Sequence, residues 1–400
     1  MICNNRTMRT VLTAEKLWNG TNLLDHPVLM IDDGRIASIF TRETGQLPAA
    51  MQSRVLDFPG ATLAPAFLDV HIHGAAGHDV MEATPEALTA IGSFLAAHGT
   101  GSFLATTVTA PLGATLRALS GLAKLVAQPR RGSEAEPHAR LLGIHLEGPF
   151  LSHAKRGVQP AEHLLQPDIA LFDRFFEAAE GHIRLMTLAP ELPGAATLAA
   201  HATARGVRIS VGHSNATAAE ARTAIAAGAV SATHTFNAMR PLDHREPGIL
   251  GTVLTSDDLF AELICDGIHT APELVKLWWR AKGPERAILV TDAMSAAGMP
   301  DGEYQLGGFA VQVANGRATA NGVLAGSVLT LDRALTNFME FTGSPLHHAL
   351  RLLTTNPAAM TGFSDQAGTL AVGAPANLVA LDEAGKLMAC IHNGQQLPSR

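Results

Sequence analysis

Eight short apolar segments recur along the middle of the chain, and stretches rich in Ala and Leu with helical spacing separate them. Parallel strands need a crossover connection, usually a helix, before the next strand can pair with the last. Eight strands that alternate with helices are therefore typical of a (β/α)8 TIM barrel, in the α/β class. The predicted strands are residues 63–70, 102–108, 140–146, 183–188, 207–211, 230–233, 260–264 and 287–291.

Start signals support three of the helices between these strands. A side-chain oxygen at the residue before a helix accepts a backbone N–H of the first turn, and Glu three residues later completes a capping box. Proline fits the first helical position because its missing N–H is not needed there. The signals are Thr84-Pro85-Glu86, Thr217 with Glu220, and Thr270 with Glu273.

Both ends of the chain predict strands instead of this alternation. Residues 11–18, 28–31 and 35–40 precede the barrel, with an Asp33-Gly34 turn between the last two, and residues 376–381 and 386–391 follow it. We therefore predict a small β-sandwich domain assembled from residues 1–60 and 366–400, beside a catalytic barrel at 61–365. Residues 302–322 predict a Gly-rich hairpin insertion, and 327–341 and 345–354 predict closing helices.

Composition narrows the classes of function. The 400 residues are 47% hydrophobic and 16% charged, which is typical of a folded globular protein. With 29 basic against 36 acidic residues, the chain has no excess of positive charge for binding nucleic acid. No apolar run reaches the roughly 18 residues of a membrane span, and the N-terminus lacks the apolar core of a secretory signal. We expect a cytoplasmic protein without a nucleic-acid or membrane partner.

Cysteine and histidine usage point to different chemistry. Cys3, Cys265 and Cys390 lie far apart with no CxxC spacing, which argues against a disulfide framework and against a thiolate zinc site. The chain has 18 histidines beside a single tyrosine. Because imidazole ligates metals and transfers protons near neutral pH, some of these histidines are expected to carry chemistry.

Histidine and carboxylate side chains stand at the ends of five predicted strands. Active sites of (β/α)8 barrels lie at the carboxyl ends of the strands, so these side chains are expected to converge. His71 and His73 end the first strand, where strand alternation puts both imidazoles on one face. At the other strand ends stand Glu147, His213, His234 and Asp292.

Taken together, these residue types predict a metal site. A lone histidine is more often a hydrogen-bonded core or surface residue, and a lone aspartate after a strand is commonly a helix cap. Several imidazoles and two carboxylates buried at one barrel mouth without a cation would cost on the order of several kcal/mol. Nitrogen and oxygen ligands without thiolates suit divalent zinc, iron, manganese or cobalt.

The same strand-end pattern resembles the amidohydrolase superfamily. Longer motifs are similar to those of its N-acetylglucosamine-6-phosphate deacetylase family, and the similarity covers essentially the whole chain. The motifs are IHLEGPF at 144–150, VGHS at 211–214, THTFNAM at 233–239, HREPG at 244–248, DGIH at 266–269 and VTDA at 290–293. The resemblance implies a metal-dependent hydrolase that converts N-acetylglucosamine 6-phosphate to glucosamine 6-phosphate and acetate, in amino-sugar catabolism or cell-wall recycling.

The resemblance also implies roles for the strand-end residues. Glu147, His213 and His234 would bind a principal metal, and His71 and His73 would help to hold a second one, with Glu147 bridging. Zinc is expected first, and a second site that is vacant in the working enzyme is the open alternative. Asp292 would be the catalytic residue that takes a proton from the attacking water and returns it to the leaving amine.

Substrate contacts are implied in the same way. Arg245 would bind the phosphate in the neighbouring subunit's site, which implies a homodimer. Gln159 stands where the family usually has histidine, which leaves the choice between gluco and galacto substrates open. The residues in this set are Val158, Gln159, Asn237, Ala238, Arg245, His269, Leu324 and Ala325. The alternatives are an N-acetylgalactosamine-6-phosphate deacetylase, another N-acyl hydrolase on the same scaffold, or a non-catalytic binding module that has lost its metals.

Overall fold

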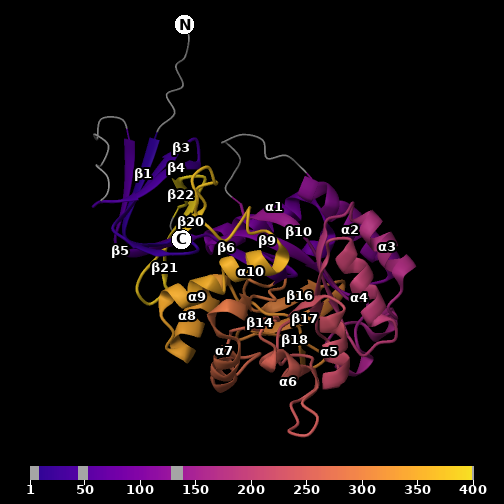
Figure 1. The fold of residues 1–400 in the computed structure, drawn as a ribbon. Coiled ribbons are helices and arrows are strands. Elements are labelled where there is room, and N and C mark those ends of the chain that lie inside the picture. Colours follow the sequence, from indigo (N-terminus) through magenta and orange to yellow (C-terminus); the bar gives the residue numbers. More distant parts are fainter. Residues whose placement is uncertain (1–8, 44–52, 128–137, 399–400) are drawn as a thin grey trace.

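The computed structural model describes residues 9–43, 53–127 and 138–398 (Figure 1). One of its two eight-stranded sheets consists of parallel strands that pair in chain order, as the alternation of strands and helices predicts. The strands are β6 (Phe67–Ile72), β9 (Thr100–Thr107), β10 (Arg140–Glu147), β11 (Ile183–Leu188), β12 (Arg208–Val211), β13 (Ala229–Ala232), β14 (Phe260–Ile264) and β15 (Ala287–Val290).

The residues that follow β15 close this sheet into a barrel. The Asp292 N–H donates to the His71 carbonyl at 2.9 Å, and the His73 N–H donates to the Ala293 carbonyl at 2.8 Å. Deeper in the barrel, the Thr291 hydroxyl donates to Asp69 Oδ2 at 2.6 Å. The seam between the last and first strands therefore runs directly beside His71, His73 and Asp292.

Helices surround this barrel and bury their apolar faces against it. Those that follow the first seven strands are α1 (Pro85–Ala97), α2 (Leu112–Ala127), α3 (Ile169–Ala178), α4 (Ala195–Ala204), α5 (Ala218–Ala226), α6 (Gly248–Thr255) and α7 (Pro272–Arg286). The closing helices are α8 (Leu331–Thr342), α9 (Leu346–Arg351) and α10 (Thr355–Thr361). α8 and α9 lie within or close to the predicted ranges 327–341 and 345–354, whereas α10 follows the second range and is not predicted. Within the described ranges no helix combines the length and apolar character that crossing a membrane requires.

Two of the three predicted helix starts are confirmed. Thr84 caps α1 with proline in the first turn, and Thr217 forms a reciprocal capping box with Glu220 at α5. The third prediction is wrong, because α7 begins at Pro272 and has Ala271 as its N-cap. Proline at the first helical position shifts the cap by one residue and leaves the Thr270 hydroxyl without a capping role.

The first predicted barrel strand is divided between two strands. Residues 63–65 end β5 (Ser53–Pro65), which belongs to the sheet built from the two ends of the chain, and β6 begins at Phe67. Leu63 and Phe67 are both fully buried, so the apolar run continues across the break. Periodicity alone cannot separate two consecutive buried strands from one.

The two ends of the chain build one β domain around its own core, as predicted. Its sheet has the order β22-β21-β20-β5-β1-β3-β4, with β2 paired to β1, and it is one continuous sheet. The strands besides β5 are β1 (Arg9–Trp18), β2 (Leu23–Asp25), β3 (Pro27–Asp32), β4 (Arg35–Thr41), β20 (Leu378–Leu381), β21 (Leu387–His392) and β22 (Gln395–Gln396). The predicted turn at Asp33 and Gly34 joins β3 to β4 with both residues at positive φ, 51° and 74°.

The predicted Gly-rich insertion is an antiparallel sheet that packs over the mouth of the barrel. It comprises β16 (Gly302–Leu306), β17 (Phe309–Ala314), β18 (Arg317–Ala320) and β19 (Val323–Leu324), each paired with the next. Its apolar side chains form a small core with Val108, which follows β9, and Met294, which follows β15. The insertion therefore covers loops at the carboxyl ends of the barrel strands.

Candidate active site

Six side chains from five barrel strands meet at the carboxyl end of the barrel. Each belongs to a residue that is less than a tenth exposed. His71 lies in β6, His73 follows it directly and Glu147 ends β10. The other three are each the second residue after a strand, namely β12, β13 and β15. The six residues are His71, His73, Glu147, His213, His234 and Asp292.

Glu147 lies at the centre of this group. Its Oε1 is 3.3 Å from His71 Nε2, 3.2 Å from His213 Nε2 and 3.3 Å from His234 Nε2. Its Oε2 is 3.4 Å from His73 Nε2. The Nε2 atoms of His213 and His234 are themselves 3.0 Å apart. One carboxylate therefore faces all four imidazoles, each through the same ring nitrogen.

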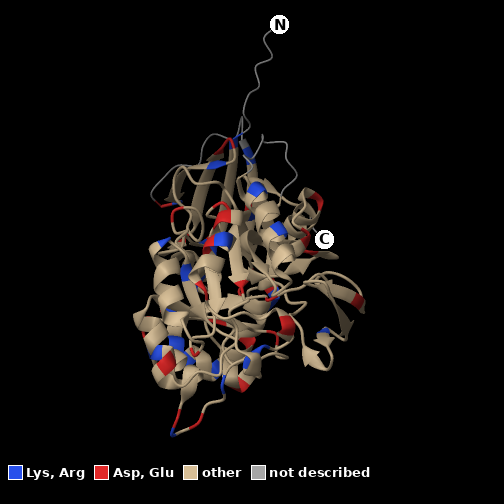
Figure 2. Cartoon of the chain, turned by 90° about the vertical axis from the view of Figure 1, so that its right-hand side faces the viewer, with Lys and Arg blue, Asp and Glu red and all other residues tan. Residues whose placement is uncertain are grey.

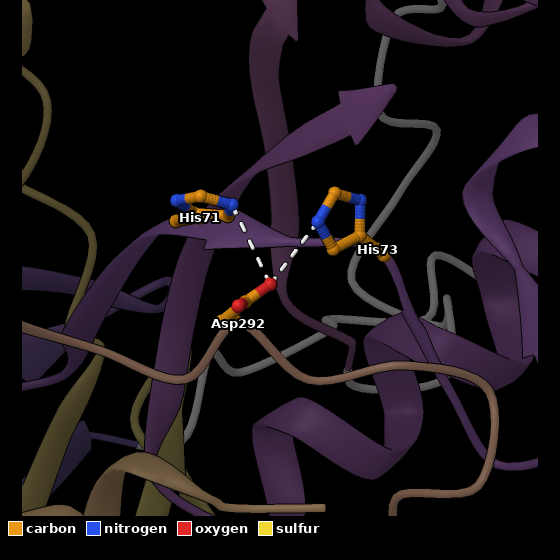
Figure 3. Close-up of side chains that lie close together, drawn as sticks. All are labelled: His71, His73 and Asp292. Carbon is orange, nitrogen blue, oxygen red and sulfur yellow. Dashed lines mark ion pairs between the residues drawn. The ribbon is translucent and has the colours of Figure 1, made fainter. Parts of the chain in front are cut away.

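Asp292 faces the two histidines of the first strand from the opposite side of the seam (Figure 3). Its Oδ1 is 3.1 Å from His73 Nε2 and 3.5 Å from His71 Nε2. Both rings point toward the carboxylate because side chains two residues apart on a strand share a face. The predicted convergence of the HxH pair with the aspartate after the last strand is thus present in the fold.

The donor set fits a divalent cation. Ligands about 2.0–2.2 Å from one ion lie about 3.0–3.5 Å from one another, which matches the 3.0–3.5 Å separations in this group. His71 Nε2 is buried without a hydrogen-bond partner, as a nitrogen lone pair reserved for a metal would be. Two overlapping groups have ligand spacing, namely His71 with His73 and Asp292, and His71 with Glu147 and His234.

Cysteine does not contribute to this group. Cys265 and Cys390 are buried free thiols that belong to neither ligand group, and Cys3 lies outside the described residues. Burial raises the pKa of the Cys265 thiol well above its ordinary value, so this sulfur stays protonated at neutral pH. The two candidate ligand groups in the described barrel therefore offer nitrogen and oxygen atoms alone.

Three of the six residues have backbone conformations that side chains other than glycine rarely adopt. The φ angles are 46° at His213, 28° at His234 and 49° at Asp292. Such positions cost about 1–3 kcal/mol each and persist where the surroundings enforce them. They turn the chain sharply at the strand ends, and the Asp292 N–H bond to the His71 carbonyl helps to hold one of these turns.

Two of the imidazoles are oriented by backbone carbonyls. His73 Nδ1 lies 2.9 Å from the Thr106 carbonyl, and His213 Nδ1 lies 3.1 Å from the Lys155 carbonyl. Because a carbonyl oxygen only accepts hydrogen bonds, each Nδ1 must carry the proton. The Nε2 lone pairs are then free to face Glu147 and a cation.

Protons and a cation compete for these imidazoles. Burial works to lower the pKa of His73, but hydrogen bonds and charge from Asp292 and Glu147 outweigh it and raise the pKa to about 9. Burial likewise opposes ionisation of Asp292, yet the neighbouring His71 and His73 lower the pKa of this carboxyl to about 2. Ligands must lose their protons before they bind metal, so cation affinity is expected to rise with pH.

Metal removal should therefore change stability in a pH-dependent way. Protonated His73, with a folded-state pKa of about 9 against 6.5, stabilises the metal-free protein fully below pH 6.5 and loses this effect as the pH rises through 9. Metal-bound protein gains affinity over the same range. We expect the Tm difference between zinc-loaded and chelator-treated protein to widen from about pH 6.5 to about pH 8.5. Differential scanning calorimetry measures it, and a constant or narrowing difference would contradict this competition.

Gln159 reaches the ligand group. Its Nε2 donates to Glu147 Oε2 at 2.9 Å, and its Oε1 accepts the Thr109 N–H at 2.8 Å. The side chain is buried and both ends of the amide have partners inside the site. The neighbouring Val158 packs against the small core of the insertion. In this arrangement Gln159 orients Glu147, a role that sequence reasoning misses.

Other predicted contact residues flank Asp292 or the His213 turn. The Ala238 carbonyl accepts the Ser214 N–H at 2.9 Å, and the buried Asn237 Nδ2 has no hydrogen-bond partner in the described structure. Ala325, next to Leu324, is two residues before Ser327, whose N–H donates to the Asp292 carbonyl at 2.7 Å. Between them, Gly326 has φ +63°, and a Cβ there would lie 3.0 Å from the Asp292 carbonyl oxygen.

Two further predicted residues lie on loops. His269 Nδ1 is 2.7 Å from Asp266 Oδ2, and Asp266 Oδ1 also accepts the N–H groups of Ile268 and His269. Burial opposes ionisation of Asp266, but the bonds from His269 lower the pKa of this carboxyl. Arg245 is exposed on the loop before α6, which projects from the barrel and carries charges of both signs (Figures 1 and 2). No hydrogen bond or ion pair links Arg245 to the six central residues within the described chain.

Glu262 and Asp69 are the buried carboxylates that sequence reasoning misses inside the barrel. Both are fully buried, in the strand sequences FAELI and FLDVHI. Asp69 closes the seam through Thr291, and Glu262 Oε2 lies 3.2 Å from His71 Nδ1. A charged residue within an otherwise apolar strand is the signal that points to such positions.

Comparisons with known proteins agree with this geometry. Residues 62–396 match the model of the amidohydrolase family. The N-acetylgalactosamine-6-phosphate deacetylase of Escherichia coli O157:H7 is 39% identical over 376 residues, covering 94% of this chain and 96% of that protein. The N-acetylglucosamine-6-phosphate deacetylase of Bacillus subtilis strain 168 is 37% identical over 370 residues, 91% of each chain. The deacetylase of Mycobacterium smegmatis, solved as a mutant in complex with N-acetyl-D-glucosamine-6-phosphate, has a TM-score of 0.88 at 36% identity, covering 97% of this chain and 99% of that one.

Proposed function

This chain belongs to the amidohydrolase family, and we propose that it hydrolyses the acetamide of N-acetylglucosamine 6-phosphate to glucosamine 6-phosphate and acetate. The observation that carries the proposal is the placement of four imidazoles around Glu147 with Asp292 beside them. Such a group serves hydrolysis of an unactivated amide, which needs a strong nucleophile and a proton for the departing amine. The relatives from Bacillus subtilis and Mycobacterium smegmatis support this substrate.

The ligand group and Asp292 divide the chemistry between them. A divalent cation held by these ligands supplies Lewis acidity that lowers the pKa of water toward about 7 and polarises a carbonyl. Asp292 is ionised at neutral pH, since its pKa is about 2, and accepts a proton as the water oxygen attacks the acetyl carbon. It then donates this proton to the sugar nitrogen as the C–N bond breaks, which leaves acetate and the free amine.

We infer a site that holds two cations, with zinc as the first expectation and iron, manganese or cobalt as alternatives. Glu147, His213 and His234 would hold the principal ion, and His71 and His73 a second. Two observations support a two-ion site: Glu147 Oε1 faces His71, His213 and His234 while its Oε2 faces His73, and His71 belongs to both groups with ligand spacing. A bridging carboxylate would leave Asp292 free for proton transfer.

The remaining predicted residues would bind the sugar phosphate. His269, oriented by Asp266, would contact the substrate near the reacting group, and Asn237 with its unpartnered Nδ2 would donate to the ligand. Arg245 would bind the phosphate of the partner subunit's substrate. Its exposure on a projecting loop supports a role across a homodimer rather than within its own barrel.

N-acetylgalactosamine 6-phosphate is the second candidate substrate. The Escherichia coli relative named for that activity is 39% identical to this chain, and Gln159, at the position where the family resemblance implies histidine, lies against Glu147. The two sugars differ only in the configuration of one hydroxyl, and hydrogen-bonding sites discriminate such differences more strongly than apolar pockets do.

Side-by-side kinetics on the two epimers test the assignment. We expect kcat/KM for the gluco substrate to exceed that for the galacto substrate. Acetate release is measured for both 6-phosphates under identical metal loading, with unphosphorylated N-acetylglucosamine as the control for phosphate recognition. A galacto preference of about tenfold or more would make the second candidate the correct one.

A further inference from the structure

Glu262 is a buried carboxylate that the proposed reaction does not use. It lies on β14, is fully buried, and projects into the barrel interior. Its Oε2 is 3.2 Å from His71 Nδ1, although β14 and β6 are not neighbours in the sheet and β15 lies between them. The same oxygen accepts the His234 N–H at 3.4 Å. One carboxylate thus contacts a residue of each ligand group.

The burial of Glu262 constrains the proton on His71. An ionised carboxylate in a barrel interior is costly unless hydrogen bonds compensate it. Its Oε1 has no partner in the described structure, so the Nδ1–H of His71 and the His234 N–H are its donors there. When His71 donates its Nδ1–H to Glu262, the Nε2 lone pair of His71 faces Glu147 and Asp292.

His71 is the one candidate ligand whose outer nitrogen meets a carboxylate. His73 and His213 have backbone carbonyls in that position, and His234 Nδ1 is buried without a partner in the described chain. A carboxylate on the outer N–H fixes the ring and raises the basicity of the metal-binding nitrogen more than a neutral carbonyl does. Among the four imidazoles, the Glu262 carboxylate therefore contacts that of His71 alone.

We propose that Glu262 is a positioning residue that fixes His71 as a ligand and thereby sets the affinity of the metal subsite that His71 serves. The inference rests on the proposed metal-dependent hydrolysis but concerns binding and not turnover. Because Glu262 also accepts the His234 N–H, it lies at the junction of both metal subsites. Its contact with the imidazole itself, however, is with His71 only.

Cobalt titration of chelator-treated protein tests this role. Glu262→Gln removes the charge with little change in shape, and we expect it to weaken binding of the ion held through His71 by about 10- to 100-fold. The affinity for the other ion, which is not held through His71, should stay within about threefold of its wild-type value. Visible absorption of bound cobalt reports the affinities, and elemental analysis after gel filtration reports the stoichiometry.

A double-mutant cycle separates positioning from general damage. In a His71→Asn background, Glu262→Gln should change cobalt affinity by less than about twofold, because its route to the metal is gone. Asp332→Asn is the control, since this carboxylate pairs with the imidazole of His98 between α1 and α8, outside both ligand groups. It should leave cobalt affinity unchanged.

Several results would overturn the proposal. They are a wild-type cobalt affinity in Glu262→Gln, a loss of cobalt affinity in Asp332→Asn equal to that in Glu262→Gln, and an undiminished effect of Glu262→Gln in the His71→Asn background. If Glu262→Gln does not fold, nitrogen-15 spectra of zinc-loaded wild-type protein decide. The signal of the His71 Nδ1 proton is assigned as the one that disappears in His71→Asn. Its presence in the wild-type spectrum would support the proposal, and a wild-type spectrum without it would refute the proposal. A chain that binds metal in this way but releases no acetate would contradict the proposed function alone.

Discussion

Asp292→Asn should lower kcat by about 10³-fold while metal content stays at the wild-type level. General acid–base catalysis contributes about 10²–10⁴-fold, and Asp292 is assigned both halves of the proton transfer. The amide keeps the size of the side chain and a hydrogen-bond acceptor, but it cannot accept the proton of water or deliver it to the amine. KM should change much less than kcat, because the interaction is made in the transition state.

The control for Asp292→Asn is a variant that loses a carboxylate charge outside the candidate site. Asp332→Asn removes a carboxylate that pairs with His98 at 3.1 Å between α1 and α8, outside the candidate site, and it should leave kcat unchanged. Elemental analysis of each variant separates a catalytic defect from a loss of metal. A decrease below about tenfold in kcat for metal-loaded Asp292→Asn would exclude the general-base role.

The sequence predicts the barrel well because its signals are local and repeated. Each parallel strand is buried on both sides and reads as a short apolar run, and each helix between runs has its own periodicity. The six central residues could be found from the sequence because (β/α)8 barrels place their active sites at the carboxyl ends of the strands, where all six stand. They are His71, His73, Glu147, His213, His234 and Asp292. The assignment fails at residues 63–70, where one apolar run contains the end of β5 and the start of β6.

Long-range partners are what the sequence does not reveal. Glu262 contacts His71 from 191 positions away in the sequence. No spacing rule connects a residue of β14 with one of β6, two strands away in the closed barrel. Gln159 can be read as a substrate contact from its motif, yet its amide bonds Glu147 and the Thr109 backbone. Both depend on the curvature of the closed sheet, which brings side chains of distant strands to one axis.

Arg245→Ala should raise KM for the phosphorylated substrate by about 10- to 150-fold and leave KM for unphosphorylated N-acetylglucosamine nearly unchanged. A hydrogen bond to a charged group contributes about 1.5–3 kcal/mol, and a guanidinium binds phosphate with two parallel N–H groups. Arg245→Lys keeps the charge but loses this geometry, so it should recover part of the affinity. Equal effects on both substrates would show that Arg245 does not bind the phosphate.

Mixing two defective variants tells whether Arg245 acts in the partner's site. In a dimer of one Arg245→Ala and one Asp292→Asn subunit, a composite site pairs the intact Asp292 of the first chain with the intact Arg245 of the second. After subunit exchange at equal amounts, half of the dimers are mixed and each has one complete site, so activity at a substrate concentration well below KM should return to about a quarter of the wild-type level. If each subunit used its own Arg245, no mixed dimer would contain a complete site, and the mixture would stay as inactive as its components. The exposed position of Arg245 on a projecting loop makes recovery the expected result.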